Sequence, residues 1–466
     1  MELREAIRRN PMSRFQWSVV VICILLTVID GYEILVTAFT LPALTKTWGL
    51  TLGQQGLVAS IGTLGMGIGA ALLSPLADRL GRRRHIITSL ICIVIGMVLS
   101  GLATGFTMFL VCRFLAGLFL GGIVPSINVL VAEYASDKRR GTVMGVYGIG
   151  FPLGAAIGGF LSIFLISAFT WRGPFFFSAA VTALMLVWVI VALPESVGYL
   201  VEKRPAGALE AYNKIGAKLG LAPATELPAP TSAKLKPSLG KDLLQGIMLR
   251  RTILLWLSYG LLIASFYFAN SFTAKLVAES TGNANIGITA QALVATGGVI
   301  GALIFAALSA RIHPRIVTAV IMFFGTVVFF LFANFFHVTS LVFLLAVLIG
   351  VAVNGGVAAY YAVSPPIYPT GIRASAVGLM MGFGRVVAFL APNIAAFLLA
   401  QGLTAPNVYQ VYGVVLAVSG VAIFLLHKTY SGANKLDAMQ LEAQAAAAAT
   451  EVVSDDAGTR LVTDKR

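Results

Sequence analysis

Charged side chains are scarce in this chain of 466 residues, since Asp, Glu, Lys and Arg make up only 11% of it and 58% is hydrophobic. A soluble globular protein carries about 25% charged residues. The sequence therefore has too few charges to cover its own surface, which excludes a soluble globule. Apolar runs of about 20 residues recur instead, and each can cross a hydrocarbon core as a helix. We expect an all-α membrane protein.

Other absences exclude or disfavour several classes of function. The three cysteines, Cys23, Cys92 and Cys112, fall inside apolar runs without metal-ligand spacing, so we interpret them as buried thiols and expect no metal and no cofactor. No G-x-x-x-x-G-K-[ST] phosphate loop is present, which disfavours ATP-driven transport. No signalling domain is visible, which disfavours a membrane sensor. The basic N-terminus lacks a small-residue cleavage site, so we expect a cytoplasmic tail and a retained first helix.

Positive charge is present in excess, with a formal net charge of +14 at pH 7. The Lys and Arg residues lie in short connectors between apolar runs, which indicates membrane topology and not nucleic-acid binding. We predict twelve spans, from about 16–40 to about 406–427. Because the basic connectors lie on the side of the N-terminus, both termini should be cytoplasmic in an inner membrane.

One long connector divides the spans. We predict an N-terminal six-helix bundle at 1–193, a cytoplasmic central loop at 194–250, a C-terminal six-helix bundle at 251–428 and a cytoplasmic tail at 429–466. The halves also resemble each other, because GIGAALLSPLADRLGRR (67–83) aligns with VIGALIFAALSARIHPR (299–315). Parallel repeats are expected of a transporter that rocks two bundles about a central site.

The connector after the second span reads SPLADRLGRRR (74–84). It resembles the signature loop of the major facilitator superfamily, G-x-x-x-D-R-x-G-R-[KR]-x, with Ser74 in place of the first glycine. The resemblance implies the major facilitator fold and a latch in which the aspartate meets the start of a helix in the other half. A plain positive-inside loop would need neither Asp78 nor Gly81. We assign gating to Asp78, Arg79, Gly81, Arg82, Glu133, Arg140 and Arg373.

The first span carries Asp30 and Glu33, which project from nearly the same helix face. Two ionised carboxylates there would repel each other. Either one is protonated or Arg113 in the fourth span neutralises one of them, and both arrangements suit proton coupling. The alternatives are an inert buried ion pair for the carboxylates and a snorkelling side chain for Arg113. We predict that Asp30, Glu33 and Arg113 couple transport to protons.

The string DGYE at 30–33 resembles the D-G-x-D motif of the aromatic acid:proton symporter family within this superfamily, with glutamate as the second acid. The resemblance implies a carboxylate substrate. Arg385, in the eleventh span, can bind a carboxylate with its bidentate fork, although an internal ion pair is the alternative. Aromatic and amide side chains suited to a flat acid accompany it: Tyr267, Asn270, Gln291, Asn354, Tyr360 and Tyr361.

We therefore predict a monomeric, non-enzymatic symporter that imports a benzoate-like aromatic acid with protons. The nearest alternative is a symporter for aliphatic organic anions such as sugar acids. A proton-driven drug exporter is a further alternative, and Arg385 disfavours cationic drugs.

Overall fold

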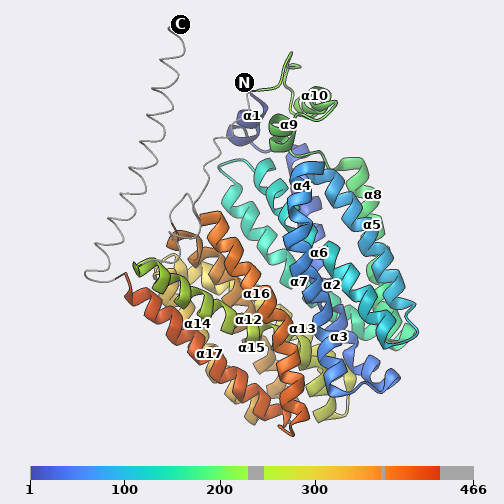
Figure 1. Cartoon of the computed structure of the whole chain (residues 1–466), viewed down its shortest axis with the longest axis vertical. Helices are drawn as coiled ribbons and strands as arrows, with labels where there is room; N and C mark the ends of the chain where they lie inside the picture. The colour runs from blue at the N-terminus through green and yellow to red at the C-terminus, as the bar shows by residue number, and fades with distance from the viewer. Residues whose placement is uncertain (1, 229–245, 369–372, 431–466) are drawn as a thin grey trace.

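The computed structural model describes residues 2–228, 246–368 and 373–430, and these residues form helices without any strand (Figure 1). Eleven helical stretches are long and apolar enough to span a membrane. One of them, Thr142–Ala192, has 51 residues and includes two helices joined by the short turn η1 (Thr170–Arg172). Twelve spanning helices result, and the predicted fold class is confirmed.

The spanning helices form two sets that lie side by side, from blue to green and from olive to red in Figure 1. The first half contains α2 (Arg14–Trp48), α3 (Leu52–Leu72), α5 (Arg82–Gly101), α6 (Phe106–Tyr134), α7 (Arg140–Phe169) and α8 (Gly173–Ala192). The second half contains α12 (Gly246–Thr281), α13 (Ala284–Ser309), α14 (Pro314–Asn334), α15 (Thr339–Val363), α16 (Arg373–Ala400) and α17 (Ala405–Lys428).

The most extensive contacts between the halves are those of α3 with α16, α7 with α13, and α2 with α12. The pairs α2–α7 and α3–α6 pack closely within the first half because small residues remove the side chain at the contact. A Cβ on Gly117 would meet the backbone of Gly62, and a Cβ on Gly154 would meet the carbonyl of Val28. The Gly154 contact fixes α2, which carries both acidic residues, closely against α7.

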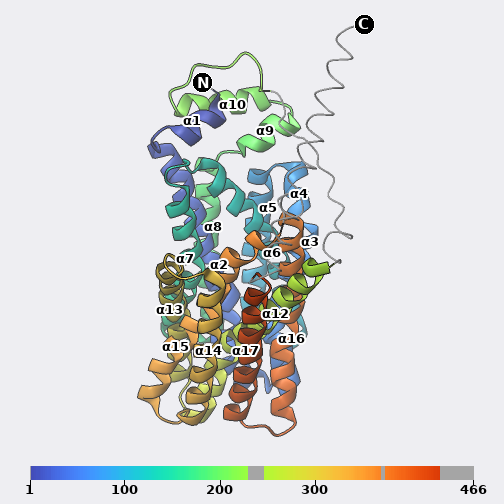
Figure 2. The ribbon, with the colours of Figure 1, turned by 90° about the vertical axis from the view of Figure 1, so that its left-hand side faces the viewer.

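Short helices gather at one end of the first half, which we call the terminal face (Figure 2). They are α1 (Leu3–Arg9), α9 (Val197–Lys203) and α10 (Ala208–Lys218), and their apolar side chains continue the core of the first half. From the sequence, the N-terminus was predicted to be a tail and 194–250 a connector, so these short helices were not predicted. The division into four domains remains a prediction, and the tail beyond residue 430 lies outside the described residues.

The helices α2 and α12 are enclosed on all sides toward the end that lies away from the terminal face. Every residue of 35–41 in α2 and of 265–278 in α12 is buried. A helix that is buried around its whole circumference has packing partners in every direction. The space between the halves is therefore closed at the end opposite to the terminal face.

Candidate functional site

Glu33 points from α2 into the first half. Its side chain is 1% exposed, and its Oε1 accepts hydrogen bonds from Ser178 Oγ at 2.9 Å and Thr182 Oγ1 at 2.7 Å. Both hydroxyls come from α8, one helical turn apart. Glu33 thus ties α2 to α8 inside the first half, and its carboxylate is fully enclosed.

Arg113 lies beside Glu33 but binds its backbone. Its Nη2 donates to the Glu33 carbonyl at 2.9 Å, its Nη1 contacts Met97 Sδ at 3.2 Å, and its guanidinium lies 5.7 Å from the centre of the Phe175 ring. The side chain is 2% exposed, so it does not snorkel to an interface. The structure places Arg113 next to Glu33 as expected, and the two side chains attract each other without a hydrogen bond between them.

Asp30, one turn earlier on α2, faces the second half. Its carboxylate interacts electrostatically with Glu33 and with Arg385 of α16. Asp30 is 7% exposed, and its buried Oδ1 has no hydrogen-bond partner in the described part of the chain. A buried carboxylate oxygen without a donor is costly, so such a group calls for a functional explanation.

Arg385 occupies the middle of α16 and lies between the halves. A Cβ on Gly67 of α3 would lie 3.1 Å from the Cβ of Arg385, so the glycine allows α3 to pass closely. Within the described residues, the single hydrogen bond of Arg385 goes from Nη1 to the Tyr267 hydroxyl at 3.0 Å. Its charge also interacts with Tyr259, Tyr361 and Asp30. The guanidinium therefore keeps most of its donors for another acceptor.

Tyr361 is the exposed member of this cluster. It interacts electrostatically with Arg385, Tyr267 and Asp30, and yet its side chain is 54% exposed. Its neighbour Tyr360 points elsewhere, because its hydroxyl is hydrogen-bonded to Ser258 inside the second half and the residue is 0% exposed. Of the two tyrosines that the sequence put forward, the structure brings Tyr361 to Arg385 and places Tyr360 in the core.

The predicted amide side chains lie on the closed side of Arg385. Asn270 and Gln291 are 1% and 0% exposed, and Gln291 Nε2 donates to Asn270 Oδ1 at 3.4 Å. Asn354 has different surroundings: its Nδ2 donates to the Val294 carbonyl at 3.3 Å and joins α15 to α13. The structure brings Asn270 and Gln291 together and gives Asn354 a contact between two helices of the second half.

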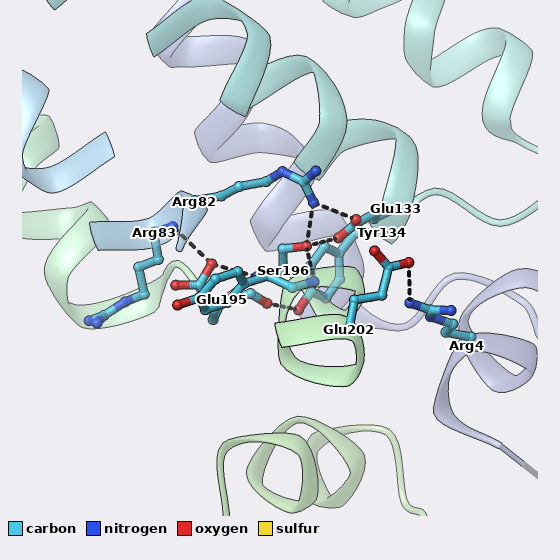
Figure 3. A network of polar contacts seen from close by, with 9 residues as sticks. Arg4, Arg82, Arg83, Glu133, Tyr134, Glu195, Ser196 and Glu202 are labelled. Atoms are coloured by element: carbon cyan, nitrogen blue, oxygen red, sulfur yellow. Dashed lines mark hydrogen bonds and ion pairs between the residues drawn. The ribbon is translucent and has the colours of Figure 1, made fainter. Parts of the chain in front are cut away.

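Two of the residues predicted to take part in gating, Arg82 and Glu133, belong to a polar network at the terminal face (Figure 3). Arg82 Nη1 donates to Glu133 Oε1 at 2.8 Å and to Ser196 Oγ at 2.6 Å, and the Ser196 hydroxyl donates to Glu133 Oε2 at 2.7 Å. Ser196 also caps α9 through the amide of Tyr199. These contacts join α5, α6 and α9 within the first half, and none of them reaches the second half.

The other residues predicted to take part in gating have separate surroundings. Gly81 has a φ of +99°, and a Cβ there would lie 2.6 Å from Glu195 Oε2, so both backbone and space require glycine. The Arg79 carbonyl accepts a hydrogen bond from the Tyr199 hydroxyl at 3.2 Å, and Arg140 is exposed at the start of α7. Asp78 lies in the short helix α4 (Ser74–Leu80) and Arg373 begins α16. The side chains of these two residues lie outside the described part of the structure.

Sequence reasoning missed several residues that complete the site. Ser178 and Thr182 bind Glu33, Tyr147 of α7 interacts with Thr27 and Asp30, and Tyr259 accompanies Arg385. Hydroxyls in apolar spans are common, and nothing in one sequence tells which helix faces the acid. The i, i+4 spacing of Ser178 and Thr182 is the one signal that pointed to a shared face.

The chain is similar to known transporters over most of its length. Residues 21–289 and 255–457 match the family described as Major Facilitator Superfamily. The chain is 28% identical to a gallate transporter of Pseudomonas putida over 429 residues, which are 91% of this chain and 94% of the relative. It is 29% identical to the 4-hydroxybenzoate transporter PcaK of Acinetobacter baylyi over 440 residues, with 91% and 94% covered.

A solved structure shares the fold. The xylose transporter XylE from E. coli, in a partially occluded inward-open conformation, superposes with a TM-score of 0.69 at 15% identity and covers 88% of this chain and 98% of its own. Relatives named as transporters of aromatic acids confirm the predicted resemblance to the aromatic acid:proton symporter family. The chain is a multi-pass membrane protein and no enzyme: it belongs to the Major Facilitator Superfamily of transporters.

Proposed function

We propose that this transporter imports an aromatic carboxylic acid together with protons across the cytoplasmic membrane. The observation that carries the proposal is Arg385, a cation in the middle of a span whose single hydrogen bond within the described residues goes to Tyr267. A cation in a membrane span is costly unless an anion or a polar cavity compensates it. A substrate carboxylate supplies that anion, and the planar guanidinium can bind it with two parallel hydrogen bonds.

The aromatic part of the proposal rests on the side chains around Arg385 and on the relatives. Phe266 and Tyr267 form an edge-to-face pair with ring centres 5.0 Å apart, and Tyr259 and Tyr361 complete the surroundings of the guanidinium. Aromatic rings prefer such edge and offset contacts with another ring. Transporters of gallate and 4-hydroxybenzoate are related to the chain over nine-tenths of its length.

Proton coupling follows from the position of Asp30 relative to Arg385. Among the described residues, Asp30 is the acid that interacts with Arg385. A bound carboxylate competes for the same guanidinium, and a proton on Asp30 then removes the repulsion between the two acids. Substrate and proton thus favour each other's binding, which corresponds to a negative, favourable coupling free energy between two sites. Glu33 and Arg113 hold α2 in place beside this site.

The direction of access is part of the same proposal. The basic connectors put the terminal face in the cytoplasm, together with both termini. The closed ends of α2 and α12 then lie at the outer side, and the state described here faces inward. The network of Arg82, Glu133 and Ser196 makes the inner end of the first half rigid, so that it moves as one body when the halves rock.

A binding experiment with the purified protein tests the proposal. Benzoate-type acids should raise the melting temperature, whereas a sugar acid at the same concentration should not. Arg385→Lys loses the bidentate fork and should weaken binding by about 10- to 100-fold, because a charge-assisted hydrogen bond contributes about 1.5–3 kcal/mol. Arg311→Lys, at an exposed position just beyond α13, is the matched control. Equal stabilisation of the wild type and Arg385→Lys would refute the assignment of the carboxylate site.

A further inference from the structure

Arg315 is a buried cation in the first turn of α14, at the end of the second half where α12 begins and α17 ends. The residue is 8% exposed, and its guanidinium has no hydrogen-bond acceptor among the residues that the structure describes. The guanidinium carbon lies 3.5 Å from the centre of the Tyr430 ring, just after α17. Stacking on a ring compensates part of the charge but satisfies none of the five N–H donors. A buried guanidinium with open donors calls for an acceptor from outside the described chain.

A second arginine lies against the same ring and differs in this respect. The guanidinium of Arg251 is 3.7 Å from the centre of the Tyr430 ring, so the ring lies between two guanidinium groups. Arg251 donates from Nε to Thr429 Oγ1 at 3.2 Å and from Nη2 to the Thr429 carbonyl at 2.9 Å. Arg315 is thus the member of the pair whose donors remain available.

The second half supplies no acid to this end. Residues 246–430 contain eight Lys and Arg residues and a single acid, Glu279, which lies just beyond the closed end of α12. Instead, two imidazole rings with centres 5.2 Å apart, those of His313 and His427, interact with Arg315. The Nδ1 of His427 is buried and has no hydrogen-bond partner in the described part of the chain. The cluster therefore gathers positive charge and an unpaired ring nitrogen around one place.

This place lies where a bilayer has its head groups. Because α14 is long and apolar enough to span a membrane, its first turn belongs at the membrane–water interface. Two turns further along, about 12 Å from Arg315, the exposed Phe323 lies over the seam between α14 and α17, since a Cβ on Gly420 would be 3.2 Å from its ring. The two helices lie side by side at one flank of the second half (Figure 1). They also expose the apolar side chains of Val320, Phe324, Val421, Phe424 and Leu425.

We propose that Arg315 binds the phosphate of an anionic phospholipid whose acyl chains lie along the seam between α14 and α17. A guanidinium binds a phosphate with two parallel hydrogen bonds, and basic pockets between spanning helices bind anionic head groups on the cytoplasmic side. The apolar seam favours a lipid over a free anion, which would gain nothing from it. The site is separate from Arg385 and does not depend on which acid the protein carries.

Native mass spectrometry of the purified full-length protein in detergent, titrated with phospholipids, tests the inference. Phosphatidylglycerol should bind at least tenfold more tightly than phosphatidylcholine with the same acyl chains, because the latter has no net charge. Inorganic phosphate at the same concentration should not displace it. Arg315→Gln should weaken the binding of phosphatidylglycerol about 10- to 100-fold, the range expected when a charge-assisted hydrogen bond is lost. Arg315→Lys keeps the charge without the fork and should give an intermediate affinity.

Arg311→Gln is the matched control, since Arg311 is an exposed arginine of the same connector and its substitution should leave the affinity unchanged. Wild-type affinity in both Arg315 variants, or equal losses in Arg311→Gln and Arg315→Gln, would overturn the inference. Displacement of the lipid by inorganic phosphate would show a site for free anions. A further outcome concerns the acids of the C-terminal tail. If the full-length variant Asp437→Asn/Glu442→Gln bound phosphatidylglycerol and the wild type did not, the tail and not a lipid would occupy the site.

Discussion

Asp30 and Glu33 lie one turn apart on the same helix, but their surroundings differ in kind. Glu33 receives two hydroxyl donors from α8 and is sealed inside the first half. Asp30 has a buried oxygen without a donor in the described residues and faces Arg385 across the boundary between the halves. Hydrogen bonds to a fixed neighbour suit a structural group, whereas an unsatisfied acid between moving bodies suits a group that exchanges a proton.

The largest expected effect comes from Asp30→Asn. In proteoliposomes with an inside pH one unit above the outside, the wild type should accumulate its substrate about tenfold if one proton accompanies each monoanion, because one pH unit corresponds to about 1.36 kcal/mol. The variant should equilibrate its substrate without accumulation and retain counterflow exchange, since Asn keeps the shape of the side chain. Accumulation by the variant to the wild-type level would place the coupling proton elsewhere.

Asp137→Asn provides the matched control for this experiment. Asp137 is an exposed acid of the terminal face that pairs with Arg8 at 3.1 Å. Exposed ion pairs contribute little to stability, about 0–1 kcal/mol. This variant should accumulate substrate like the wild type.

A smaller effect, on stability, should follow from Glu33→Leu. The substitution leaves the hydroxyls of Ser178 and Thr182 without their acceptor, and each unsatisfied buried group costs about 1–3 kcal/mol. The melting temperature in detergent should fall by several degrees. Glu33→Gln keeps an acceptor oxygen and should restore both stability and accumulation. If Glu33→Gln abolished accumulation, Glu33 would carry the proton and the contrast with Asp30 would be wrong.

The contrast between the two acids could not be read from the sequence, although the acids themselves could. Spacing of three residues puts both on nearly one face, and it led to one shared role for Asp30, Glu33 and Arg113. What separates them is the tertiary packing: α8 brings Ser178 and Thr182 to one acid, and α16 brings Arg385 to the other. The fold determines which helix packs on each side of α2, and the local sequence pattern around the two acids does not reveal it.

More of the fold than of the site could be predicted from the sequence. Hydrophobic runs predicted the twelve spans because the bilayer imposes their length. The short helices α9 and α10 were not predicted because they are amphipathic and lie outside the apolar runs. Tyr360 and Tyr361 show why the site residues were harder to predict. Adjacent residues on a helix point about 100° apart, and of these two only Tyr361 interacts with Arg385.

The smallest expected effects form a matched pair of hydroxyl deletions, one beside each acid. Thr182→Val removes a single donor to Glu33, and Tyr147→Phe removes a hydroxyl that interacts with Thr27 and Asp30. Both changes nearly conserve side-chain volume, so packing stays intact. One hydrogen bond contributes about 0.5–1.5 kcal/mol to stability, which sets the scale of either effect.

The two deletions should act on different measurements. Thr182→Val should lower the melting temperature by a degree or two and leave the rate of proton-driven uptake unchanged, because Ser178 still holds Glu33. Tyr147→Phe should lower that rate severalfold and leave the melting temperature unchanged, because it alters a group beside the acid that exchanges its proton. If both variants lost uptake in equal measure, the hydroxyls of α8 would belong to the proton path. Glu33 and Asp30 would then act as one coupled pair, and Glu33 would not be a purely structural residue.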